Sequence, residues 1–275
     1  MVPKQIPARS VVGAHSKRRG RADGTRSRGR PGKPRTAQAD ESAGGDGSLS
    51  GGGRRKRTVQ DLVYDELRRS LMTGVFTPGE KISLRRLTEQ TGTSMMPVRE
   101  AVNRLIAERA FQVVPKRQVI VPPMTAEKFD EIVHWRVELE SAAVRAACRK
   151  VTPELIRRLE EINKQIIEAV ESDHKDALLP LNYEFHFTIY GAAQLEVLRP
   201  MIESLWLQAG PFTYYSTPSP RALWDVRHHR DLLNALQRGD ESDAQQAVTR
   251  DIETAALFLK RLGHFSKPRV RRVAA

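Results

Sequence analysis

The sequence predicts a mainly α protein, in which a small module of short helices and one β-hairpin precedes an all-α helical bundle. Two patterns support this fold class. Residues 82–121 hold two short amphipathic segments joined at a glycine turn, followed by two β-branched runs around a Pro-Lys-Arg tip. From residue 126 to 265 the apolar spacing is helical, with no alternating strand pattern. A chain of 275 residues has room for about two such domains.

Capping residues define the first helices of the module. Thr58 and Asp61 resemble a capping pair for a helix that runs to about Gly74. Ser83 can accept a hydrogen bond from the exposed amides of the next, shorter helix. Gly92 can adopt the left-handed conformation that ends this short helix. These signals predict a tight turn between two short helices.

The helix after that turn has one apolar and one polar face. Ser94 can cap it, and Pro97 is tolerated in its first turn. Four apolar residues form its buried stripe: Val98, Val102, Leu105 and Ile106. Arg99 and Asn103 lie on the opposite face, where a helix in the major groove would present them.

A basic hairpin follows the two helices. Residues 115–118 join its two β-branched runs and place Lys116 and Arg117 at the tip, where they can contact phosphates. Two helices at a tight turn with a basic hairpin are the layout of a winged helix-turn-helix, a DNA-binding module, over residues 58–122. An ordinary basic helical subdomain is the alternative.

Residues 58–121 resemble the DNA-binding domain of the GntR family of bacterial transcription regulators. The resemblance rests on the first helix and on two further segments, Phe76–Gly79 and Pro97–Ala101. It implies that Arg85 and Arg99 contact DNA, and that a homodimer binds a two-fold-symmetric double-stranded operator. Met95 and Met96 stand where the family usually has Arg and Thr. These departures predict either a different operator sequence or weaker specificity.

The basic charge is concentrated at the N-terminus. Residues 1–57 hold 15 Lys and Arg against 4 Asp and Glu, whereas the remaining residues hold 31 against 29. This segment is rich in Gly, Ser, Pro and Arg, so we expect a disordered basic tail. It could bind phosphates without sequence preference, be passive, or precede the true start of the protein. Residues 266–275 form a second, smaller basic tail.

Cysteine content and hydropathy indicate the compartment. The one cysteine, Cys148, cannot form an internal disulfide, which fits a reducing environment. No run reaches the 18 or so apolar residues of a membrane helix, and the N-terminus lacks the apolar core of a signal peptide. We therefore expect a cytoplasmic protein without membrane contact.

Stop signals divide the second domain, residues 123–265, into helices. The breaks fall at residues 151–153, 210–211, 218–220 and 239–240, where Pro or Gly occurs. The predicted helices are roughly residues 126–150, 153–172, 176–192, 195–210, 219–238 and 240–263. Together they predict an all-α bundle.

Four polar residues in the bundle form a candidate metal site. Asn182 and His186 are four residues apart and share a helix face. Asp251 follows His229 by 22 residues across the turn at Gly239, so two antiparallel helices can bring them level. Nitrogen and oxygen donors of this kind suit a divalent metal such as Zn, Ni or Mn. Solvated polar pairs with no metal are the alternative.

Residues 125–263 resemble the FCD domain, the all-helical effector domain of the FadR subfamily. The matching residues are Arg136 and Glu140, the Asn182-x-x-Phe185-His186 motif, and residues 229–240. The resemblance implies that Asn182, His186, His229 and Asp251 hold a metal, with Asp251 in place of the usual last His. It also implies that a small carboxylate binds the metal and that Arg136 helps to hold it. A solvated pair between Arg136 and Glu140 is the alternative.

These patterns predict a ligand-responsive DNA-binding transcription regulator, a repressor, rather than an enzyme. His228 is expected to point to a different face from His229 and not to bind the metal. Two alternatives remain. The chain could coat DNA with low specificity through its basic tail, which Met95 and Met96 favour. It could also be a metal-dependent hydrolase, although no separate general base is placed for that reaction.

Overall fold

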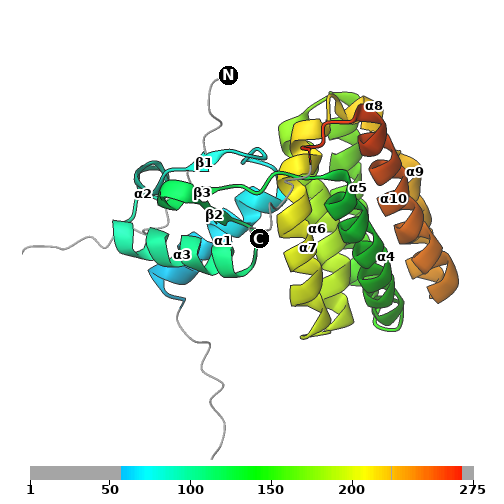
Figure 1. Cartoon of the computed structure of the whole chain (residues 1–275). Coiled ribbons are helices and arrows are strands. Elements are labelled where there is room, and N and C mark those ends of the chain that lie inside the picture. The colour runs from blue at the N-terminus through cyan, green and yellow to red at the C-terminus, as the bar shows by residue number, and fades with distance from the viewer. Residues whose placement is uncertain (1–56, 224, 268–275) are drawn as a thin grey trace, which may run out of the picture.

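The computed structural model describes residues 57–223 and 225–267 (Figure 1). The predicted basic tails, residues 1–57 and 266–275, lie outside the described residues except for Arg57, Ser266 and Lys267. Within the described ranges, no helix is both long and apolar enough to cross a membrane. Two units are visible, a small N-terminal domain and a larger helical bundle beside it (Figure 1).

The N-terminal domain is a winged helix-turn-helix, as predicted. Its elements are α1 (Val59–Met72), β1 (Lys81–Ile82), α2 (Leu84–Thr91), α3 (Met95–Ala107), β2 (Gln112–Val114), the 3₁₀ turn η1 (Pro115–Arg117) and β3 (Gln118–Ile120). The three short strands form an antiparallel sheet in the order β1-β3-β2. The pairing of β1 with β3 ties the segment before α2 to the hairpin, and this strand was not foreseen from the sequence.

The capping residues behave as the sequence predicts, with one exception. Thr58 and Asp61 form a reciprocal capping box at the start of α1, and Ser83 accepts a hydrogen bond from the Arg86 amide. Gly92 ends α2 in the left-handed conformation, with φ of 62°. Ser94 occupies the N-cap position of α3 but makes no side-chain hydrogen bond there, so the predicted side-chain cap is wrong.

The bundle is all-helical. Its helices are α4 (Ala126–Cys148), α5 (Pro153–Glu171), α6 (Lys175–Ala193), α7 (Leu198–Ser216), α8 (Pro220–Leu223), α9 (Val226–Arg238) and α10 (Glu241–Leu262). The long helix α4 packs against α10, α6 and α7, while α9 pairs with α10 and α5 with α6 (Figure 1). Four predicted helices match within a few residues. The predicted helix 219–238 is instead two helices, α8 and α9.

The predicted break at residues 210–211 is wrong, because α7 continues through Pro211 to Ser216. Here α7 packs directly against α1 of the N-terminal domain. A Cβ atom on Gly210 would lie 2.3 Å from the Leu71 carbonyl oxygen and 2.8 Å from Met72 Cα. Glycine therefore permits close contact between two helices of different domains at this point, rather than ending the helix. Arg68 and Glu203 add an ion pair of 2.5 Å across the same contact.

Candidate functional site

Three of the four predicted metal ligands converge in the bundle. His186 from α6, His229 from α9 and Asp251 from α10 offer ligand atoms that all lie within 4.8 Å of one another. His186 Nε2 is 3.2 Å from Asp251 Oδ2, and His229 Nε2 is 3.8 Å from Asp251 Oδ1. Both imidazoles are buried. Two imidazole nitrogens and a carboxylate, held by three different helices, form a donor set that suits a first-row divalent metal.

A buried hydrogen-bond chain orients His186. Tyr190 donates its hydroxyl proton to Glu140 Oε2 at 2.5 Å, and His186 Nδ1 lies 3.2 Å from the same hydroxyl oxygen. Because the Tyr190 hydroxyl donates its proton to Glu140, its oxygen can only accept from His186. We therefore assign His186 Nδ1–H as the donor to Tyr190. The Nε2 lone pair then faces the Asp251 carboxylate, an arrangement that a cation between them stabilises. Such outer partners typically fix the tautomer of metal-binding histidines.

The electrostatics favour the protonation states that a metal requires. Burial lowers the pKa of His229 to about 3, even though Asp251 acts in the opposite direction. Burial raises the pKa of Asp251, but the adjacent His186, His229 and His228 act in the opposite direction and lower this pKa to about 2. At neutral pH, His229 is therefore neutral and Asp251 is charged, which are the states that bind a divalent cation.

This shift of the His229 pKa predicts acid sensitivity of the metal-free protein. Between its usual pKa near 6.5 and about pH 3, the unfolded chain protonates His229 while the folded chain does not. Stability should therefore fall as pH drops below 6.5, by up to about 1.4 kcal/mol per pH unit from this residue. Thermal unfolding with a chelator across that range measures it. If the stability of a His229→Phe variant fell as steeply with pH as that of the wild-type chain, His229 would not be the cause of the acid sensitivity.

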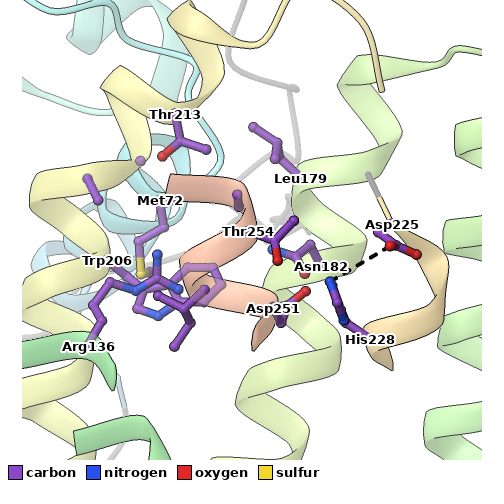
Figure 2. A pocket seen from close by; sticks show the side chains of 14 residues that line it. Met72, Arg136, Leu179, Asn182, Trp206, Thr213, Asp225, His228, Asp251 and Thr254 are labelled. Carbon is purple, nitrogen blue, oxygen red and sulfur yellow. Dashed lines mark ion pairs between the residues drawn. The ribbon is translucent and has the colours of Figure 1, made fainter. Parts of the chain in front are cut away.

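A cavity adjoins the cluster (Figure 2). It is lined by Asn182 and Arg136, the other residues predicted to form the metal and effector site. Its volume is about 60 Å³. Its polar wall is formed by Arg136, Asn182, Thr213, Asp225, His228, Asp251 and Thr254. Asn182 Oδ1 is buried and has no hydrogen-bond partner among the described residues, so it is available to an ion or ligand in the cavity. Figure 2 shows Asp251 between Arg136 on one side and His228 on the other.

Arg136 lines this cavity but is already paired. Its Nε donates to Glu140 Oε1 at 2.6 Å, and its guanidinium lies 4.6 Å from the centre of the Trp206 ring. Trp206 Nε1 also donates to Glu140 Oε1, at 3.0 Å. The Arg136–Glu140 pair expected as an alternative is thus present, but it is buried rather than solvated, because Glu140 is 0% exposed.

The predicted DNA-contacting residues lie on the surface of the small domain. Met95, Met96, Arg99 and Asn103 are exposed on α3. Lys116 and Arg117 are exposed at the tip of the wing, with φ values of 66° and 55°. Arg85 is also exposed, and its Nε lies 3.1 Å from Glu89 Oε1 on the same helix. A DNA contact by Arg85 would therefore compete with a weak, solvent-exposed pair.

Comparison with known proteins identifies the family. Residues 59–121 match the family model of the bacterial regulatory proteins, gntR family, and residues 131–254 match the FCD domain. The HTH-type transcriptional regulator McbR of Escherichia coli is 31% identical over 204 residues, which cover 73% of this chain and 92% of McbR. The chain belongs to the GntR family. Its FCD domain fits the FadR subfamily, and it is a DNA-binding transcription regulator.

Two further proteins are similar to this GntR regulator over most of their own length. The repressor RspR of Escherichia coli is 26% identical over 71% of this chain and 86% of RspR. The Nta operon transcriptional regulator of Aminobacter aminovorans is 33% identical over 62% of this chain and 80% of that protein. The solved structure of E. coli McbR/YncC matches with a TM-score of 0.70 and 28% identity, covering 74% of this chain and 98% of that one.

Three features of this GntR regulator were not predicted from its sequence. His228 lines the cavity, a position that was not anticipated, and its Nε2 lies 3.9 Å from Asp225 Oδ2. Met72 reaches the cavity from α1, in the DNA-binding domain (Figure 2). Glu140 and its buried partners also escaped notice as a group. A pair of adjacent histidines was a visible signal for His228, whereas nothing local in the sequence marks Met72.

Proposed function

We propose that this GntR regulator is a homodimeric repressor that releases its operator when a small carboxylate binds beside a divalent metal in the bundle cavity. The observation that carries the proposal is the shared wall of that cavity. Met72 belongs to the DNA-binding domain, whereas Asn182 and Asp251 belong to the bundle. The relative RspR is a transcriptional repressor, which supports the sign of regulation.

Asn182, His186, His229 and Asp251 would hold the metal. A bound divalent ion with open coordination positions would supply a Lewis acid that binds a carboxylate. Asp251 is the one charged member of this set, so a divalent ion would leave a net charge of about +1. The Arg136 charge is balanced by Glu140, with which it forms a direct ion pair. The metal, rather than Arg136, would therefore supply most of the attraction for an anion.

The cavity limits the size of the ligand. A water molecule needs about 10–15 Å³ of such space, so 60 Å³ holds roughly four to six waters. This space fits a carboxylic acid with a short carbon chain. The apolar part of the wall, which includes Leu179, Trp206 and Ile252, would contact the carbon chain. Thr213, Thr254 and His228 would contact further polar groups of the acid.

The position of Met72 supports a route by which the ligand would act on DNA binding. A ligand that displaces this side chain acts on the last turn of α1, which packs against α3 as well as α7. Suppose that the ligand binds more tightly when Met72 is displaced, and that the operator binds more tightly when it is not. The ligand must then weaken operator binding, and the operator must weaken ligand binding by the same factor. A coupling of about 1–3 kcal/mol corresponds to a change of about 5–150-fold.

The test is a footprint of the full-length chain on DNA upstream of its own gene. One short two-fold-symmetric protected site is expected, and Zn, Ni or Mn together with a short-chain acid should release it. Diffuse protection that disappears on removal of residues 1–57 would instead favour the low-specificity alternative. Turnover of simple esters by the metal-loaded chain would favour the hydrolase alternative.

Met72→Ala tests the coupling separately from binding. The variant should still bind metal and acid. The factor by which the acid weakens operator binding should be at least about fivefold smaller than in the wild-type chain. Met201→Ala is the matched control, because Met201 is exposed on α7 and does not line the cavity. An unchanged release factor in Met72→Ala would count against the proposed coupling route.

A further inference from the structure

Two methionines are exposed at the start of α3. Met95 is 39% exposed and Met96 is 61% exposed, and they are the first two residues of the helix. Single exposed apolar residues are common and need no explanation. Two adjacent ones on the second helix of a helix-turn-helix are different, because the N-terminal residues of that helix contact the base edges.

Helical spacing places Met96 on the predicted DNA face. Met96, Arg99 and Asn103 are separated by three and four residues, so they share one face of α3. The opposite face is buried in the domain core through Val98, Val102 and Leu105. Arg99 and Asn103 are exposed, and neither has a hydrogen-bond or ion-pair partner among the described residues, so both side chains are available to a ligand. Met95 lies toward α2, with its Sδ 3.8 Å from Thr88 Oγ1.

The major groove offers few apolar groups to such side chains. Its base edges carry hydrogen-bond donors and acceptors, together with the C5 methyl group of thymine. Methionine has neither a strong donor nor an acceptor, and its flexible, polarisable side chain adapts to irregular apolar surfaces. The chemical match for Met95 and Met96 in the groove is therefore the thymine methyl group.

We propose that Met95 and Met96 contact thymine methyl groups, so that each operator half-site carries thymine at the base pairs beneath the start of α3. This inference rests on DNA binding through α3. Arg99 and Asn103 would contact the neighbouring base pairs by hydrogen bonds, to guanine and adenine respectively. Specificity at the two methionine positions would then depend on shape and burial rather than on hydrogen bonding.

The test replaces thymine by uracil, which removes the methyl group and keeps every hydrogen-bonding atom. The operator is first selected with the full-length chain from a randomised duplex library. Each thymine of the selected site is then changed to uracil singly. At the positions beneath α3 the wild-type chain should bind about fourfold more weakly per thymine, equivalent to about 0.8 kcal/mol for one buried methyl group.

Variants connect the effect to the two side chains. Met96→Ala, and more fully the Met95→Ala/Met96→Ala double variant, should bind the thymine and uracil operators equally. Met201→Ala should keep the wild-type difference. Because Met96 is largely exposed, its variant should keep the thermal stability of the wild-type chain.

The outcomes separate this proposal from the proposed function. Selection of a specific site without a thymine–uracil difference would overturn the methyl contacts alone. So would a selected site without thymine beneath α3, or a double variant that retains the difference. Failure of the wild-type chain to enrich any sequence would overturn both proposals.

Discussion

Replacing Glu140 by alanine is expected to lower the free energy of unfolding by about 3–5 kcal/mol, because it leaves a buried charge without its partner. Glu140 is 0% exposed and accepts hydrogen bonds from Arg136, Tyr190 and Trp206. Without the carboxylate, all three donors lose a buried acceptor. Burial of a guanidinium that has lost its direct ion-pair partner is the most costly of these losses.

Urea unfolding followed by circular dichroism measures this loss. Glu138→Ala is the matched control, because Glu138 lies two residues earlier on α4 and is exposed. Its effect should stay within about 0.5 kcal/mol. Replacing both members of the pair, as Arg136→Met with Glu140→Leu, should restore part of the stability, since a buried ion pair can be exchanged for apolar residues. A loss below about 1 kcal/mol for Glu140→Ala would contradict the buried network.

The parts of the structure that were predictable are those with local causes. The 22-residue spacing from His229 to Asp251 places them together because Gly239 ends α9 in the left-handed conformation, with φ of 67°. The chain then returns as α10 beside α9. The turn between α2 and α3 follows in the same way from Gly92. In both places one residue sets the geometry of a whole helical hairpin.

The parts that were missed depend on contacts between distant segments. Gly210 followed by Pro211 is a local stop signal, yet α7 continues through both residues. The glycine instead lets the backbone of α1 approach α7 closely. The position of Met72 in the cavity wall comes from the same contact between domains. The burial of Glu140 needs Tyr190 and Trp206, which are 50 and 66 residues away in the chain. Helical periodicity describes one element at a time and cannot pair such segments.

Loss of His186 is expected to have the largest effect on metal binding. His186 is buried and offers Nε2 as a ligand atom, 3.2 Å from Asp251 Oδ2. His186→Ala should lower metal affinity by more than about 100-fold, because loss of even an outer hydrogen-bond partner typically costs about 10–100-fold. Tyr190→Phe tests that outer role, since it removes the hydroxyl that orients His186 Nδ1. Titration calorimetry with Zn, Ni or Mn measures both affinities.

A matched control and a charge change sharpen this metal prediction. His134→Ala should leave metal affinity unchanged, because His134 is exposed on α4 outside the cluster. Asn182→Asp should raise metal affinity by adding a second negative ligand, yet weaken binding of a short-chain acid, because the metal site would then be neutral overall. Opposite changes in the two affinities would identify Asn182 as a ligand beside the anion. Parallel changes, or an unaltered metal affinity in His186→Ala, would contradict the assigned metal site.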